Sequence, residues 1–190
     1  LTKIETGPTA IYWSPDGYRL YLTGVYSGGG RFIRELLVDQ PFTFAGIREL
    51  ARRSVGYATS MSFSPDGSVM LIVSIYNDRV YSYFGGSFSP MGMSTGPSLY
   101  ISSPSAAAFH GNGNLIYIAI GSRIYEYRLR SPFNITKPTY TKYNYSVGTS
   151  VRAMQFSPDG SSVILGFSSS AGNLRQLFLS DPWDFRSVYA

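Results

Sequence analysis

A tight turn of the Pro-Asp-Gly type follows an apolar stretch four times along this chain, at nearly constant spacing. The turn residues Asp16, Asp66, Asn112 and Asp159 lie 50, 46 and 47 residues apart. The residues up to Asp16 and those after Asp159 together amount to a further 47. The 190-residue chain therefore holds four repeats, with the fourth divided between its two ends. Such a period is typical of architectures in which each unit packs on its neighbours.

The turn itself is nearly the same in each copy. The four copies read Trp13-Ser14-Pro15-Asp16-Gly17, Phe63-Ser64-Pro65-Asp66-Gly67, Phe109-His110-Gly111-Asn112-Gly113 and Phe156-Ser157-Pro158-Asp159-Gly160. Glycine accepts a positive φ, and Asp or Asn can hydrogen-bond its own backbone. We therefore expect a structural role for eight turn residues: Asp16, Gly17, Asp66, Gly67, Asn112, Gly113, Asp159 and Gly160.

Each repeat divides into four short strands. A brief apolar strand precedes the turn, and a strongly apolar one follows it (18–25, 68–76, 114–121 and 162–167). A continuous apolar run indicates a strand buried on both faces. The third strand alternates in polarity, as in 31–36 and 123–128, which indicates a half-exposed strand. A more polar fourth strand is expected over 49–57, 98–102 and 142–147.

A second pattern follows the third strand. It reads Pro41-Phe42-Thr43-Phe44, Pro90-Met91-Gly92-Met93, Pro132-Phe133-Asn134-Ile135 and Pro182-Trp183-Asp184-Phe185. Proline cannot donate to a strand ladder, so it ends the third strand. We expect the two apolar residues after it to cover the edge of the sheet.

Four-stranded repeats of this length predict an all-β chain folded as a four-bladed β-propeller. The fourth repeat reaches Tyr189 without an evident last strand, so we expect residues 1–6 to complete that blade and close the ring, which removes exposed strand edges. The predicted blades are 9–57, 58–103, 104–149 and 150–190 together with 1–8. An open array of sheets, or four blades of a larger ring, are the alternatives.

Composition excludes several functions. The chain has no cysteine, so thiol catalysis and thiolate metal sites are excluded. Its formal charge of +5 is carried by scattered arginines, and no nucleic-acid recognition motif accompanies it. No apolar run is long enough to span a membrane. We expect neither a cofactor nor a metal.

The turn and strand sequences resemble known propeller repeats. Ser-Pro-Asp-Gly after an apolar strand, followed by Tyr18-Arg19-Leu20-Tyr21-Leu22, is similar to the TolB and YVTN repeats. The blade ends 129–136 and 179–184 resemble another repeat, found in propellers of bacterial surface proteins and of phage, in which a strand ends in Ser-Pro-Trp/Phe-Asp-Ile-Ser-Thr. This resemblance covers the whole chain and implies a propeller, a fold that serves many unrelated functions. The third copy departs from the turn pattern at His110-Gly111.

No catalytic constellation stands out. His110 is the single histidine, and its place in the repeat turn favours a structural role. The repeated turn aspartates lack the clustered oxygens that calcium needs. A glycosidase-type carboxylate pair would have to be assembled from different blades, for example from Asp78, Asp181 and Asp184. Gly28-Gly29-Gly30 lacks the Lys-Ser/Thr of a phosphate loop.

A loop surface is the remaining candidate site. In a propeller, the turns after strands two and four lie on one face, where aromatic, amide and guanidinium groups can contact glycans or proteins. The residues expected there are Tyr26, Tyr57, Tyr76, Asn77, Asp78, Arg79, Arg152 and Asn173. Asn134 and Asn144 begin N-glycosylation tripeptides.

We therefore expect a non-catalytic binding or structural propeller on a virion, a cell surface or a secreted assembly. It would contact a glycan or protein partner and could assemble with copies of itself. One alternative is a glycan hydrolase or lyase with carboxylates and arginines at the channel mouth. Another is a periplasmic interaction module of the TolB kind.

Overall fold

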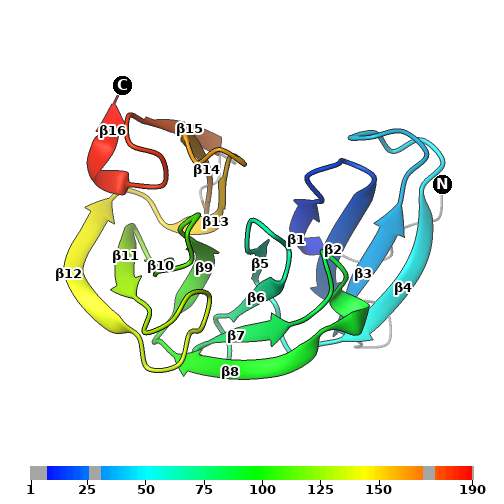
Figure 1. Ribbon diagram of the computed structural model, residues 1–190, viewed down its shortest axis with the longest axis horizontal. Helices are drawn as coiled ribbons and strands as arrows, with labels where there is room; N and C mark the ends of the chain where they lie inside the picture. The colour runs from blue at the N-terminus through cyan, green and yellow to red at the C-terminus, as the bar shows by residue number, and fades with distance from the viewer. Residues whose placement is uncertain (1–7, 26–30, 169–173, 190) are drawn as a thin grey trace.

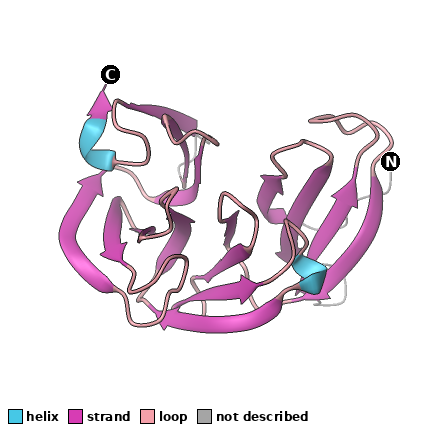
Figure 2. Cartoon of the chain, in the orientation of Figure 1, coloured by secondary structure: helices cyan, strands magenta, loops and turns pink. Residues whose placement is uncertain are grey.

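The computed structural model describes residues 8–25, 31–168 and 174–189. They form four antiparallel sheets of four strands, together with two short 3-10 helices (Figures 1 and 2). Within each sheet the strands are adjacent in chain order, and the sheets stand around a common axis with the first strand of each innermost. The chain is thus the predicted all-β, four-bladed β-propeller.

The blades follow one another along the chain. Blade 1 contains β1 (Pro8–Trp13), β2 (Arg19–Val25), β3 (Arg31–Leu37) and β4 (Arg48–Ser54). Blade 2 contains β5 (Ser60–Phe63), β6 (Val69–Ser74), β7 (Arg79–Phe84), η1 (Pro90–Gly92) and β8 (Ser94–Tyr100). Blade 3 contains β9 (Pro104–Phe109), β10 (Leu115–Ile120), β11 (Arg123–Arg128) and β12 (Thr139–Ser146). Blade 4 contains β13 (Val151–Phe156), β14 (Ser162–Phe167), β15 (Leu174–Leu179), η2 (Phe185–Ser187) and β16 (Val188–Tyr189).

The last strand of blade 4 corrects the prediction. This strand is β16, which pairs with β15 through Phe178–Tyr189 and Leu179–Val188. The fourth repeat therefore supplies its own outer strand at the end of the chain. With two residues it is too short to show a strand pattern in the sequence. Residues 1–6, to which this strand was assigned, lie outside the described residues.

Each repeat turn holds its aspartate or asparagine by hydrogen bonds within the turn. In the first copy, Asp16 Oδ1 accepts from the Ser14 hydroxyl at 2.5 Å and from the backbone N–H of Tyr18 at 3.1 Å. In the third copy, Asn112 Oδ1 accepts from the backbone N–H of Asn114 at 3.0 Å. These hydrogen bonds fix the shape of each turn, and the structural role expected of the turn residues stays a prediction.

The turn glycine also receives an aromatic side chain from the loop after the third strand. That loop residue donates its backbone N–H to the glycine carbonyl in every blade, at 2.8–3.1 Å, and it has a positive φ. A Cβ added to the glycine would lie within 3 Å of the aromatic ring. Bulky residues rarely adopt a positive φ, so packing and hydrogen bonding must hold this conformation. The four pairs are Gly17–Phe42, Gly67–Phe88, Gly113–Phe133 and Gly160–Trp183; we call each an aromatic clasp.

The clasp corrects the predicted register of the loop pattern in blade 2. The sequence analysis aligned Pro90 with Pro41 of the first repeat. In the structure, however, Phe88 makes the hydrogen bond equivalent to that of Phe42. Pro90 instead stands two positions after the clasp aromatic, where blades 3 and 4 bury Ile135 and Phe185. The prediction failed because the second copy has no proline immediately before its aromatic residue.

Neighbouring blades pack through apolar cores. The first and third interfaces also bury a tyrosine and a glutamate, whereas the second interface does not. Between blades 1 and 2, the buried Tyr21 donates to the Phe88 carbonyl and pairs in register with the buried Glu35. Between blades 3 and 4, Tyr117 and Glu126 repeat this arrangement, and Tyr117 donates to the Trp183 carbonyl at 2.7 Å.

The interface between blades 2 and 3 is of another kind. It buries a continuous apolar cluster that includes Leu71, Val80 and Ile118. Its polar link is the Ser62 hydroxyl, which donates to the Ala107 carbonyl at 2.7 Å. Blade 2 carries Leu71 and Ser82 where blades 1 and 3 carry the tyrosine and glutamate.

Replacing the clasp glycine of blade 4 tests this packing. We expect Gly160→Ala to lower the free energy of unfolding by about 1–3 kcal/mol through its left-handed backbone, and further by displacing Trp183. Gly92→Ala is the matched control, because an added Cβ there meets nothing within 4 Å; we expect a change within about 0.5 kcal/mol. Urea unfolding measures both, and equal losses would contradict the role of the clasp.

The turn carboxylates predict acid sensitivity. The hydrogen bond from Ser14 lowers the pKa of Asp16, and the one from Ser157 lowers the pKa of Asp159. Because these pKa values are lower in the folded state, the stability they supply is present above pH about 4 and is lost as pH falls through the folded pKa. We expect the melting temperature to drop below pH 4, and less so in the combined variant Asp16→Asn, Asp66→Asn, Asp159→Asn. An unchanged acid profile in that variant would contradict this.

Candidate functional site

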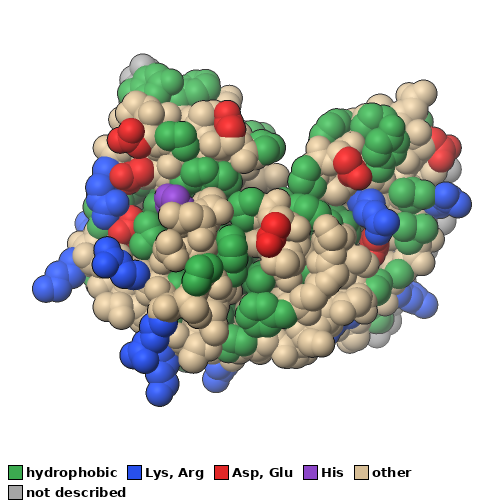
Figure 3. Space-filling model, viewed as in Figure 1, with side chains coloured by type: hydrophobic (Ala, Val, Ile, Leu, Met, Phe, Trp, Pro, Cys, Tyr) green, Lys and Arg blue, Asp and Glu red, His purple; other side chains and the backbone are tan. Residues whose placement is uncertain are grey.

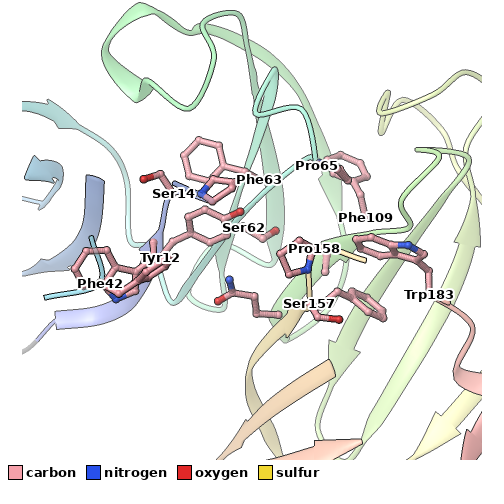
Figure 4. Close-up of a pocket in the computed structure, with 15 residues that line it drawn as sticks. Tyr12, Ser14, Phe42, Ser62, Phe63, Pro65, Phe109, Ser157, Pro158 and Trp183 are labelled. Atoms are coloured by element: carbon pink, nitrogen blue, oxygen red, sulfur yellow. The ribbon is translucent and has the colours of Figure 1, made fainter. Parts of the chain in front are cut away.

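A pocket of about 350 Å³ lies at the propeller axis, on the face that carries the repeat turns (Figure 4). All four blades contribute to it. Its lining is Tyr12, Trp13, Ser14, Pro15, Phe42, Ser62, Phe63, Pro65, Ala108, Phe109, Gln155, Phe156, Ser157, Pro158 and Trp183. Seven of these side chains are aromatic and three are proline, so the walls are mostly flat and apolar.

The repeat itself builds this pocket. The aromatic residue that ends each innermost strand lines it, which places Trp13, Phe63, Phe109 and Phe156 around the axis. The turn prolines of blades 1, 2 and 4 and two of the clasp aromatics complete the wall. The rings support one another, with centroids 4.9 Å apart for Tyr12 and Phe63, and 5.0 Å for Phe156 and Trp183. The sequence analysis placed these aromatic residues only in the brief apolar strands before the turns. Their repetition beside the turn was the signal that could have located the pocket.

The polar groups of the pocket are all uncharged at neutral pH. The hydroxyls of Ser14 and Ser157 donate to their turn aspartates, and that of Ser62 donates to the Ala107 carbonyl. Burial raises the pKa of Tyr12 to about 12, so its hydroxyl stays protonated. Gln155 adds an exposed amide. The lining contains no Asp, Glu, His, Lys or Arg. This arrangement suits binding, and it offers no group for proton transfer near pH 7.

His110 lies near this pocket but serves the turn. Its Nδ1 accepts from the Asn112 backbone N–H at 3.2 Å, and its ring lies 6.2 Å from that of Trp183. Burial lowers the pKa of His110, which favours the neutral ring. These contacts match the structural role expected from its place in the repeat.

The turn carboxylates do not come together. Each is held within its own turn, and the part of the chain that the structure describes contains no group of three metal-binding side chains. Asp78, proposed for a carboxylate pair, accepts from the Ser103 backbone N–H at 2.7 Å. Asp184 caps η2 by accepting from the Arg186 backbone N–H. Neither these two nor Asp181 lines the central pocket.

The predicted loop surface is partly assembled. Tyr57 and Tyr76 are in contact with ring centroids 4.8 Å apart and ring planes tilted by 44°, and the Arg31 guanidinium lies 3.2 Å from the Tyr57 ring centroid. Asn77 donates to the Tyr81 hydroxyl, and Arg79 donates to Ser98. Arg152 is exposed on β13. Tyr26 and Asn173 lie outside the described residues. A ligand for this surface stays a prediction.

The two glycosylation positions are half-buried. Asn134 Oδ1 accepts from the Thr136 backbone N–H at 2.9 Å, and Asn144 Oδ1 accepts from Arg123 at 3.1 Å. Their modification stays a prediction. In the described residues, no helix has the length and apolar character needed to cross a membrane.

Comparison with known proteins supports the fold. No family model and no curated sequence matches the chain, so the specific repeat type stays a prediction. Among solved structures, it is similar to a protein of Bacteroides fragilis named as a candidate 6-phosphogluconolactonase, with 11% identity and a TM-score of 0.59 over 93% of this chain and 68% of that one. It is also similar to the periplasmic gluconolactonase of Pseudomonas aeruginosa, with 15% identity and a TM-score of 0.53 over 94% and 54%.

A third similar structure belongs to a protein that is named for a different activity. It is the hydrazine synthase of Kuenenia stuttgartiensis, with 18% identity and a TM-score of 0.55 over 94% of this chain and 48% of that one. The chain thus spans about half to two thirds of the length of these proteins. Identities this low establish the propeller fold alone. The comparisons give no support to the expected virion, surface or adhesion role.

Proposed function

We propose that this chain takes an uncharged, sugar-derived ring in its central pocket. The observation that carries the proposal is the lining of seven aromatic side chains and three prolines around a few neutral polar groups. The pocket volume of about 350 Å³ is in the range of small-molecule sites. A sugar ring has an apolar C–H face that stacks on aromatic rings and hydroxyls that pair with neutral donors and acceptors.

The lack of charged side chains in the pocket lining restricts the ligand further. A phosphate or carboxylate needs a charged or well-directed donor to replace its hydration, and arginine or lysine usually supplies it. No Lys or Arg lines the central pocket. The proposed ligand is therefore a neutral sugar or sugar lactone, and a phosphorylated sugar is expected to bind more weakly.

Hydrolysis of a bound lactone is the second candidate function. The specific observation in its favour is that two of the solved propellers carry lactonase names. Because the pocket lacks an ionisable acid or base that titrates near pH 7, this chain would have to position a water through Tyr12 and Gln155 alone. Binding without turnover accords better with that lining. The expected location outside the cytoplasm stays a prediction.

Tryptophan fluorescence tests the binding proposal at the site itself. The chain has two tryptophans, Trp13 and Trp183, and both line the pocket. We expect methyl glucoside and glucono-1,5-lactone to change the emission saturably, and glucose 6-phosphate to bind at least about tenfold more weakly because its charges find no partner. No saturable change with either neutral ring would overturn the proposal.

The Tyr12 hydroxyl provides a sharper comparison. Tyr12→Phe removes one polar group from the wall, so we expect two- to tenfold weaker binding, the effect of losing about 0.5–1.5 kcal/mol. Tyr100→Phe changes an exposed tyrosine of β8 outside the pocket and should leave the affinity unchanged. Acid release followed in a pH-stat then separates the two functions, since only the second predicts lactone opening faster than the spontaneous rate.

A further inference from the structure

The side chains that are free to pair with a ligand lie on one side of the central pocket. Three polar groups of the lining make no hydrogen bond with the described residues, namely the Tyr12 hydroxyl, the Trp13 indole N–H and the Gln155 amide. They belong to β1 and β13, the innermost strands of blades 1 and 4. We call these three residues the polar side of the pocket.

The turn serines of the same two blades are already hydrogen-bonded. The Oγ atoms of Ser14 and Ser157 each donate to the aspartate of their own turn. They also accept the backbone N–H groups of Arg19 and Ser162, at 2.9 and 3.0 Å. A hydroxyl has one hydrogen to donate, and in both serines it is used. The three prolines of the lining have no backbone N–H to add.

Blades 2 and 3 build the opposite side of the pocket from apolar groups. Phe63, Pro65, Ala108 and Phe109 line it, and we call these four residues the apolar side. Figure 4 shows Pro65 and Phe109 well apart from Tyr12. The one polar side chain that these blades add to the lining is that of Ser62. It is 4% exposed, and its hydroxyl donates to a backbone carbonyl of blade 3 at 2.7 Å.

This asymmetry penalises a sugar that carries hydroxyls all around its ring. A hydroxyl placed against the apolar side would lose its hydration without gaining a partner. A methyl group in the same place would gain by leaving water and by contact with aromatic rings. Figure 3 shows apolar side chains around the central hollow of this face, with the Lys and Arg side chains farther out. The apolar character of the pocket therefore continues on the surface around it.

We infer that the pocket selects a deoxy sugar, in which a methyl group replaces a hydroxymethyl group. This inference rests on the proposed function and specifies its class of ligand. In a 6-deoxyhexopyranoside, the methyl group on C5 lies across the ring from the 2-hydroxyl. One edge of the ring is thus apolar and faces the apolar side of the pocket. The hydroxyls of the other edge pair with the hydroxyl, indole and amide groups of the polar side.

Two sugars that differ by one oxygen test this selection. Methyl 6-deoxyglucoside and methyl glucoside are each titrated into the full chain and followed by tryptophan fluorescence. We expect the deoxy sugar to bind at least about fivefold more tightly, because it lacks the hydroxyl that would be buried without a partner. Equal affinities, or tighter binding of methyl glucoside, would overturn the inference and leave the proposed function standing. If neither sugar binds, the inference is wrong, and the lactone titration alone decides the proposed function.

Variants on the two sides of the pocket locate the selection. Ala108→Ser adds one hydroxyl to the apolar side, so we expect the preference for the deoxy sugar to fall at least about twofold. Gln155→Ala removes an amide from the polar side and should weaken both sugars by a similar factor, which leaves their ratio unchanged. Far-UV circular dichroism checks that both variants are folded. A ratio that changes in Gln155→Ala and not in Ala108→Ser would contradict the assignment of the two sides.

Discussion

The fold depends on the contact between an aromatic ring and a turn glycine. In every blade this clasp joins the turn after the innermost strand to the loop after the third strand. The clasp requires a glycine in the turn, where no side chain blocks the ring. In the loop it requires a bulky aromatic residue with a positive φ. Each blade thus fixes two of its loops against each other, and a strained backbone is held by one hydrogen bond and by close packing.

The central pocket is a consequence of the same contact. The clasp holds the turn over the end of the innermost strand, so the prolines of three turns and the strand-end aromatics converge at the axis. The loops that bring the clasp aromatics also carry the carbonyls that accept from Tyr21 and Tyr117. Pocket wall and blade interface are therefore built from one set of loops, which ties the shape of the site to the stability of the ring.

The spacing of the turns was sufficient to predict an all-β propeller with four blades, because a 46- to 50-residue period and a glycine turn leave few other folds. The outer strand β16 and the register of Phe88 could not be predicted. The strand β16 has only two residues, and Phe88 has no proline before it, unlike the clasp aromatics of the other three blades. The pocket was missed for a physical reason: Trp13 and Phe156 have the pattern of core residues, and only the assembled ring shows that their edges face a shared space.

The alternation of interfaces has a consequence for the order of the blades. Tyrosine and glutamate face each other in blades 1 and 3, whereas blade 2 has leucine and serine at these positions, and blade 4 has Ile164 and Gln176. The tyrosine–glutamate pair is thus shared by blades 1 and 3 and absent from blades 2 and 4. A copy of blade 1 in the position of blade 2 would therefore bury a glutamate against the apolar face of blade 3, so the two kinds of blade cannot exchange places freely.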